Sequence, residues 1–187
     1  MGVGTGFPPA EERGTYMLSI SEKVARNIEI RREDWEKDFW ECIRDIAEHP
    51  VVLRMKLYPH HGSTNCYQHC MNVAYYNYQW CRFMHLDARA AARAGMLHDL
   101  FLYDWHTHSK KTGDHFHGMT HPKAALKNAV KFFELNATEK DIILHHMWPV
   151  TLFSVPRTKE GWVTTLTDKY CGTLETGARK HRKRRRR

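Results

Sequence analysis

The spacing of apolar residues along the chain predicts a helical protein. Over residues 34–55 the apolar side chains recur at steps of three and four, at Trp35, Phe39, Ile43 and Ile46. This period places them on one face of an amphipathic helix. No segment alternates apolar and polar residues as a half-buried strand would, so we expect an all-α fold.

Capping residues and helix breakers predict where further helices begin. Ser63 or Thr64 is expected to cap a helix that runs to about Met84. Asp87 is expected to cap the alanine-rich segment "ARAAARAGML" that follows. Pro122 suits the first turn of a further helix, because its missing N–H has no intrahelical partner there.

Two more helices are predicted in the last third of the chain. Thr138 and Asp141 are expected to form a capping box for a helix that ends before Pro149. The last helix is predicted over residues 159–176, and Gly177 is expected to stop it. These segments extend the all-α pattern to almost the whole chain.

The chain of 187 residues is long enough for one well-buried domain, which we place at residues 21–177. Residues 1–20 are rich in Gly and Pro and are predicted to form a flexible arm. Residues 178–187 are predicted to be a disordered basic tail. The last nine residues hold eight of the 29 Lys and Arg, so the rest of the chain balances its 21 Asp and Glu. A neutral body argues against long nucleic acid as the main substrate, and the tail allows only a weak nucleic-acid contact.

The cysteines and the absence of long apolar runs indicate in which cellular compartment the protein is expected. The five cysteines are odd in number, have no C-x-x-C spacing and lie mostly among bulky apolar residues. We therefore expect reduced core thiols in a cytoplasmic protein. No apolar run is long enough to cross a bilayer, and the first residues lack the pattern of a secretory signal, so no membrane partner is expected.

Histidines and aspartates supply the candidate chemistry. Twelve of the fourteen histidines lie between His60 and His146. His98 and Asp99 stand side by side in the apolar run "GMLHDLFLYDW", where burying two ionisable groups is costly unless something compensates. Imidazole and carboxylate together suit Mn, Fe, Zn, Co or Ni. We therefore expect this pair to face a metal ion.

The order of these residues, H…HD…H…H…D, resembles the HD-domain superfamily of metal-dependent phosphohydrolases. The segments "HGSTNC", "HDLFLYDWHTH", "HFHGMTHP", "HMWP" and "DKYC" resemble a bacterial subgroup of it. The resemblance covers about residues 34–176 and implies a helical bundle around a metal site. The implied ligands are His69, His98, Asp99, His121, His146 and Asp168, with His145 as the alternative to His146.

The resemblance also implies how these ligands are shared. The first ion would be held by His69, His98, Asp99 and Asp168. The second would use His121 and His146, with Asp99 as the bridging carboxylate. Two divalent transition-metal ions are therefore expected, and His98 and Asp99 would serve catalysis. A water bridging ions roughly 3.5–4 Å apart would be deprotonated near neutral pH and would attack phosphorus.

One departure from the family pattern concerns phosphate binding. Many HD phosphodiesterases carry a lysine three residues after the HD aspartate, where this chain has Leu102. Transition-state charge must then be met elsewhere. The loop formed by residues 103–120 and the residue after Asp168 offer candidates, and His60 and His61 are candidates for orienting a ligand. The candidate substrate-binding residues are His106, His108, Lys110, Lys111, His115, His117 and Lys169.

Three functions follow from these features. The first is a phosphomonoesterase or phosphodiesterase that acts on a nucleotide or another small phosphorylated metabolite. The second is a di-iron oxygenase, because some HD proteins with the same ligand order have that activity. The third is a non-catalytic RNA- or ribosome-associated protein that binds through the basic tail. We favour the phosphohydrolase.

Overall fold

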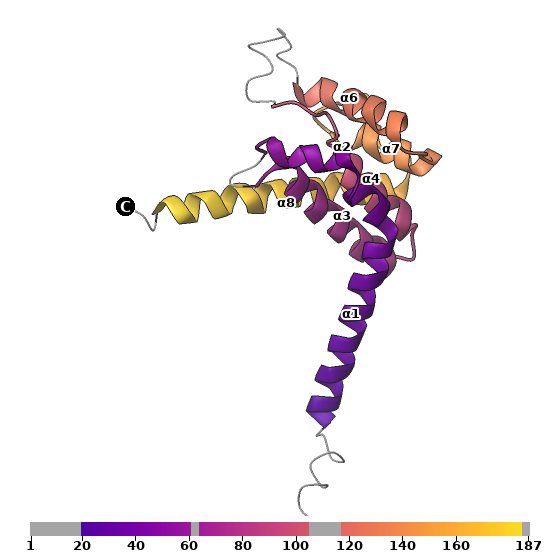
Figure 1. The fold of residues 1–187 in the computed structure, drawn as a ribbon, viewed down its shortest axis with the longest axis vertical. Helices are drawn as coiled ribbons and strands as arrows, with labels where there is room; N and C mark the ends of the chain where they lie inside the picture. Colours follow the sequence, from indigo (N-terminus) through magenta and orange to yellow (C-terminus); the bar gives the residue numbers. More distant parts are fainter. Residues whose placement is uncertain (1–19, 61–63, 105–116, 185–187) are drawn as a thin grey trace, which may run out of the picture. The chain divides into compact units, whose positions relative to one another are not determined.

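The computed structural model describes residues 20–60, 64–104 and 117–184, with side chains described over 34–60, 64–104 and 118–177. These residues form helices and one isolated β-bridge, which confirms the predicted all-α fold (Figure 1). The chain divides into two compact units, residues 1–38 and 39–187, and the candidate site lies in the second. The helices are α1 (Ile20–Ala47), α2 (Pro50–Leu53), the 3-10 helix η2 (Arg54–Leu57), α3 (Cys66–Phe83), α4 (Ala88–Leu97), α6 (His117–Phe132), α7 (Ala137–His145) and α8 (Lys159–Arg184).

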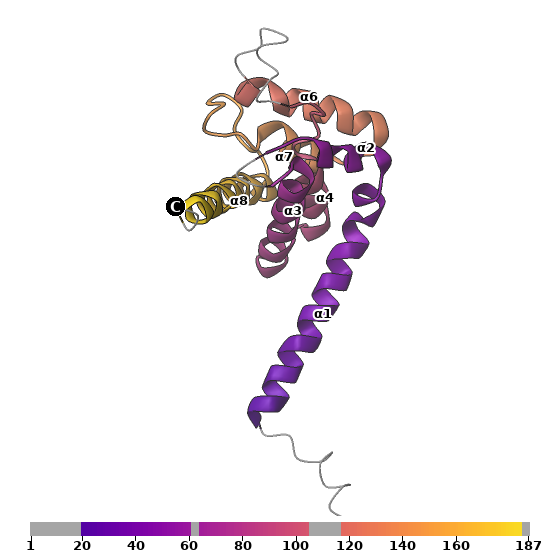
Figure 2. The same ribbon diagram turned by 60° about the vertical axis from the view of Figure 1, so that its left-hand side comes forward.

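The helices of the second unit enclose one hydrophobic core. Helices α3 and α4 pack against each other and against α8, while α7 contacts α4, α6 and α8. Figure 2 shows α3 and α4 side by side, with α6 across one end. Fully buried aliphatic side chains fill the space between them, including Ile43, Met96, Leu97, Ile142 and Ile143.

Helices α3 and α4 approach each other closely at Gly95. A Cβ atom added to Gly95 would lie 2.8 Å from the Cα of Ala74 on α3 and 2.8 Å from Nδ2 of Asn77. The buried Asn77 amide donates to the carbonyl of Ala91 on α4 (3.1 Å) and to Oγ1 of Thr164 on α8 (2.9 Å). Gly95 thus allows α3 and α4 to approach closely, and Asn77 links α3 to α4 and α8 by hydrogen bonds.

The predicted helix over residues 34–55 is interrupted, and it begins earlier than expected. Helix α1 starts at Ile20, because residues 20–33 are rich in good helix formers, and it ends at Ala47. His49 then accepts a hydrogen bond from the N–H of Val51 (3.2 Å) and begins α2, with Pro50 as its first residue. Proline is compatible with a first turn but not with a continuing helix. The rest of the predicted N-terminal arm lies outside the described residues.

Two predicted caps are wrong by one or two residues. Helix α3 is capped by Asn65 rather than by Ser63 or Thr64, in a capping box with Gln68. Helix α7 likewise begins with a capping box between Asn136 and Glu139, not between Thr138 and Asp141. Asparagine caps as well as serine does, so the local sequence allows several starts. The predicted Asp87 cap of α4 is confirmed, because its carboxylate accepts from the N–H of Ala90 (2.8 Å).

The limits of α6 and α8 also differ from the predictions. Helix α6 begins at His117, so Pro122 lies in its second turn, where burial of the proline offsets the one hydrogen bond that it cannot make. Helix α8 begins at Lys159 as predicted but passes through Gly177 and ends at Arg184. A single glycine costs a helix only about 1 kcal/mol, and the Lys and Arg that follow favour a helix C-terminus. The part of the predicted disordered tail that the structure describes is therefore helical.

The state of the cysteines agrees with the prediction of core thiols. All five cysteines are free, and four of them are buried, as predicted for core thiols. Among the helices that the structure describes, none combines the length and apolar character needed to span a bilayer.

Candidate metal centre

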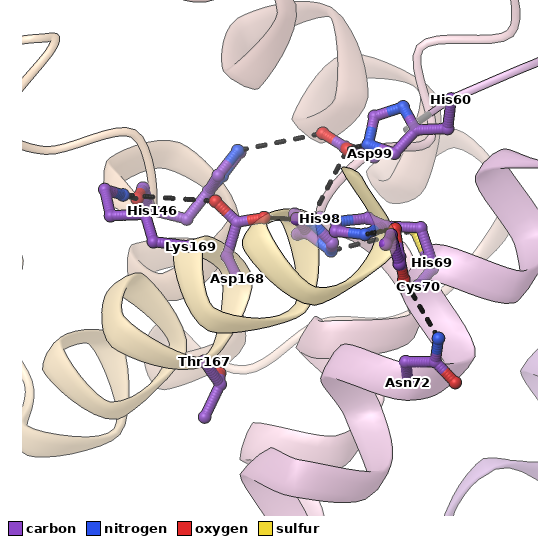
Figure 3. A network of polar contacts seen from close by, with 12 residues as sticks. His60, His69, Cys70, Asn72, His98, Asp99, His146, Thr167, Asp168 and Lys169 are labelled. Carbon is purple, nitrogen blue, oxygen red and sulfur yellow. Dashed lines mark hydrogen bonds and ion pairs between the residues drawn. The ribbon is translucent and has the colours of Figure 1, made fainter. Parts of the chain in front are cut away.

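The six predicted ligands lie together, although they come from five segments of the chain. His98 is the C-cap of α4 and Asp99 follows it, so the end of this helix directs both into the core. The other four project from α3, α6, the end of α7 and α8. All of them are buried or nearly so, and Figure 3 shows most of them converging on one point. The six residues are His69, His98, Asp99, His121, His146 and Asp168.

Three of these side chains form a first group around Asp168. Its Oδ1 atom lies 3.1 Å from Nε2 of His69 and 3.6 Å from Nε2 of His98. One potential ligand atom from each residue lies within 4.8 Å of the others. A carboxylate oxygen and two imidazole nitrogens in this arrangement could hold one divalent ion.

A second group surrounds Asp99. Its Oδ1 atom lies 3.2 Å from Nε2 of His121 and 3.7 Å from Nε2 of His146, and these two nitrogens are 3.0 Å apart. The other oxygen, Oδ2, lies 3.5 Å from Nε2 of His98. The Asp99 carboxylate thus stands between the two groups, where a bridging ligand would be expected.

The structure brings His146, not His145, into this cluster. The Nδ1 atom of His146 hydrogen-bonds the carbonyl of Ile143 (2.9 Å), which turns Nε2 toward Asp99. The Nδ1 atom of His145 instead pairs with Oδ1 of Asp141 (2.8 Å). Asp141 also accepts from the N–H groups of residues 157 and 158, so His145 helps to anchor the segment that leads into α8.

Two buried polar atoms of the cluster make no hydrogen bond, namely Nε2 of His98 and Oδ1 of Asp99. Nδ1 of His98 donates to the carbonyl of Gly95 (2.8 Å), so Nε2 is left with a lone pair that faces the cluster. Although His121 is near Oδ1 of Asp99, the contact lacks hydrogen-bond geometry. An unsatisfied buried acceptor costs about 1–3 kcal/mol, and a bound cation would remove that cost. The residues present therefore fit a metal ion.

Burial and neighbouring charges separate the pKa values of the histidines. Burial opposes protonation of His69, but its hydrogen bonds to Asp168 and Glu175 outweigh this and raise its pKa to about 10. Burial and the proximity of His98 and His121 lower the pKa of His146 to about 3. His146 is thus neutral, as a metal ligand must be, whereas His69 must release a proton before it can bind a metal through Nε2.

Both aspartates are held in the charged form. Burial opposes the charge of Asp168, but the hydrogen bond from His69 and the proximity of the His98 imidazole keep its pKa well below its usual range. The pKa of Asp99 is also well below its usual range, because the nearby imidazoles of His98, His121 and His60 outweigh burial. Two carboxylates ionised near neutral pH would attract a divalent cation.

Sequence reasoning missed Glu175 on α8. Its Oε2 atom accepts from Nδ1 of His69 (3.0 Å) and from Oγ1 of Thr64 (3.1 Å), and Oε1 accepts from Nδ2 of Asn72 (2.9 Å). Glu175 therefore fixes the orientation of the His69 ring. Metal-binding histidines are commonly oriented in this way by a carboxylate that accepts a hydrogen bond from their other ring nitrogen. The available signal is its spacing, because Glu175 lies seven residues after Asp168 and so on the same helix face.

His60 lies closer to the cluster than the sequence analysis assumed. Its Nε2 atom is 3.2 Å from Oδ2 of Asp99, and its ring centroid is 4.3 Å from that of His69. His60, His69 and Asp99 form a further group of potential ligand atoms within 4.8 Å of one another. His60 could thus orient Asp99 or take a coordination position itself.

Of the predicted substrate-binding residues, only Lys169 has a described side chain. Its ammonium donates to the carbonyls of His146 (3.2 Å) and Thr165 (3.2 Å) and lies 3.9 Å from Oδ2 of Asp168. Burial lowers its pKa, and the nearby Asp168 opposes this shift. The backbone of His117 is described but its side chain is not. The remaining candidates, His61, His106, His108, Lys110, Lys111 and His115, lie outside the described residues.

Comparison with known proteins agrees with this arrangement. Residues 66–172, more than half of the chain, match the family model of the HD domain. The matched range contains all six clustered residues. No curated protein and no solved structure matches the chain.

Proposed function

The chain belongs to the HD-domain family, and from this membership we propose that it is a phosphohydrolase of nucleotides or other small phosphorylated metabolites. HD domains are typical of metal-dependent hydrolases. The observation that carries the proposal is the convergence of four buried imidazoles and two carboxylates, in which Nε2 of His98 and Oδ1 of Asp99 make no hydrogen bond. Such a donor set suits Mn, Fe, Co, Ni or Zn.

The proposed ligands form two sets that share Asp99. One set adds His69, His98 and Asp168, and the other adds His121 and His146. When bound, divalent ions act as Lewis acids that lower the pKa of water and offset negative charge on phosphate. A site for two ions is supported by the position of the Asp99 carboxylate, whose two oxygens face different imidazoles.

The chain's own residues prepare this site. The carbonyls of Gly95 and Ile143 hold the Nδ1 protons of His98 and His146, which directs both Nε2 lone pairs inward. Glu175 does the same for His69. Because these partners fix the rings before anything binds, little conformational entropy is lost when a ligand arrives. Lys169 places a partly exposed cation beside Asp168, where it would attract a phosphate group.

A small substrate fits the charge distribution. The Lys and Arg outside the last nine residues only balance the acids, whereas proteins that bind long nucleic acid use many phosphate contacts. We therefore place any nucleic-acid contact in the basic end of α8 and keep it separate from the reaction.

Metal analysis followed by a substrate screen tests the proposal. Protein purified without added metal is analysed for transition metals and then tested with Mn²⁺ on a panel of phosphomonoesters, phosphodiesters and nucleotides. Hydrolysis that a chelator abolishes and that is lost in Asp99→Ala supports the proposal. Bound iron with oxygen consumption and no hydrolysis would replace it with the oxygenase. RNA binding that survives metal removal, again without hydrolysis, would favour the non-catalytic function.

A further inference from the structure

Helices α3 and α8 share an exposed apolar face that the proposed reaction does not use. The two helices pack against each other. The exposed side chains of this surface, which we name the α3–α8 face, are Trp80, Phe83, Met84, Leu166, Tyr170 and Leu174. On α8 they recur at intervals of four, so they form one stripe along the helix.

The apolar stripe on α8 contains no charged residue, because the charged side chains of this part of the helix point toward the candidate metal centre. Between Gly161 and Thr176 the charged residues are Asp168, Lys169 and Glu175. All three contact residues of the candidate metal centre. The opposite side of the helix presents Leu166, Tyr170 and Leu174 instead. A shortage of charged residues, together with aromatic, Met and Leu side chains, is typical of the core of a protein–protein interface.

The exposed area matches what a stable interface needs. Trp80 and Tyr170 are each 51% exposed and Phe83 is 75% exposed, so these three rings alone present on the order of 350 Å². The three aliphatic side chains bring the face to the upper end of the range of about 300–600 Å² for the largest apolar patch of a monomer. A standard interface covers about 800 Å² per partner, of which about 500 Å² is apolar.

The face also combines a groove with projecting side chains. A groove of about 530 Å³ runs between the two helices, with Val163 and Tyr76 among its lining residues. Leu166 lines this groove and is still 68% exposed, and Phe83, outside the lining, is 75% exposed. A two-fold interface uses the same patch on both subunits. That patch must therefore contain both a groove and protruding side chains that fit into the groove of the other subunit. An almost uncharged patch also avoids the like-charge repulsion that would arise when a surface meets its own copy.

From this geometry we propose that the α3–α8 face binds a second copy of this chain, which makes the protein a two-fold symmetric dimer. In the dimer, α3 and α8 of each subunit pack against their counterparts in a four-helix arrangement. The candidate metal centre lies on the inward side of α8, so each subunit keeps its own site. Dimerisation does not depend on the proposed phosphohydrolase activity.

Solution mass measurements on the full chain test this proposal. Light scattering after gel filtration, across a dilution series, should give wild-type protein twice the 22.1 kDa mass of the chain. Leu166→Glu on α8 and Phe83→Glu on α3 each place a charge in the face and should halve that mass. Leu57→Glu is the matched control, because Leu57 is an equally exposed residue (75%) on η2, outside the face. It should leave the dimer intact.

Circular dichroism and thermal melting keep the result interpretable. All exchanged side chains are exposed, so each variant should retain the helical content of wild type. Wild-type protein that stays monomeric at every concentration would overturn the proposal and point to another occupant, such as the N-terminal residues or a different protein. A dimer that survives both Leu166→Glu and Phe83→Glu in folded protein would overturn it equally, because the contact would then lie elsewhere.

Discussion

Replacement of Gly95 by alanine tests how tightly the fold controls the candidate site. A methyl group at this position would meet the backbone of Ala74 and the amide of Asn77, both at 2.8 Å. Carbon atoms in favourable contact are about 3.5–4.0 Å apart, so the helices must separate by about 1 Å. The neighbour is backbone rather than the end of a flexible side chain. Helix α4 therefore has to move, and it takes His98 with it.

The size of the effect follows from two opposing contributions. Alanine is favoured over glycine within a helix by about 1 kcal/mol. Overpacking a rigid contact costs about 1–3 kcal/mol, and disturbing the Asn77 hydrogen bonds to Ala91 and Thr164 costs about 1 kcal/mol more for each bond lost. The destabilising contributions exceed the helix gain, so Gly95→Ala should reduce the free energy of unfolding by about 1–3 kcal/mol. In a chain of this size that corresponds to a melting temperature lower by about 2–12 °C.

Thermal melting of two variants separates the contact from the helix propensity. Gly177 lies on α8, and a Cβ atom there would meet nothing within 4 Å. Gly177→Ala should therefore leave the melting temperature unchanged or raise it slightly, while Gly95→Ala lowers it. Gly95→Ala should also weaken metal binding, since the carbonyl of Gly95 orients His98. A Gly95→Ala protein at least as stable as Gly177→Ala would refute the close approach of α3 and α4.

Three further predictions concern the groups around the site. Glu175→Ala should lower metal affinity about 10–100-fold, measured by chelator competition, and Glu175→Gln should lower it less because it keeps an acceptor for His69. Metal affinity should rise with pH across the neutral range, because His69, with a pKa raised to about 10, must release a proton on binding; affinity that does not change with pH would contradict this. Arg93→Met should destabilise the fold by about 3 kcal/mol in urea titrations, because Arg93 neutralises the buried carboxylate of Glu139 at 2.9 Å; a loss below about 1 kcal/mol would show that Glu139 finds another partner.

Much of the fold could be predicted from the sequence because helical periodicity is a local property. The steps of three and four around Phe39 and the Asp87 cap depend only on neighbouring residues. Exact helix starts were harder to predict, since Thr64 and Asn65 are both competent caps and only packing selects between them. The prediction that α8 stops at Gly177 was wrong because the Lys and Arg residues that follow favour a helix C-terminus and offset the cost of one glycine.

The candidate site was predictable as far as residue types and their order allowed. The resemblance to the HD-domain superfamily implied His69, His98, Asp99 and Asp168, and the structure brings these side chains together. Glu175 was missed because its partner, His69, lies 106 residues away, and the spacing of seven residues from Asp168 does not identify that partner. The choice between adjacent histidines at the end of α7 also needed three dimensions, since it depends on which ring faces the Asp99 carboxylate.

The most direct test of the account is the amount of metal that each chain binds. Wild-type protein, Asp99→Ala and His121→Ala are incubated with Mn²⁺, Fe²⁺ or Zn²⁺, desalted and analysed by mass spectrometry for bound metal, with the fold checked by circular dichroism. The account predicts two ions per chain in wild type, about one in His121→Ala, and loss of both in Asp99→Ala. Folded wild-type protein that binds none of these metals, or an Asp99→Ala protein that binds as much as wild type, would contradict it.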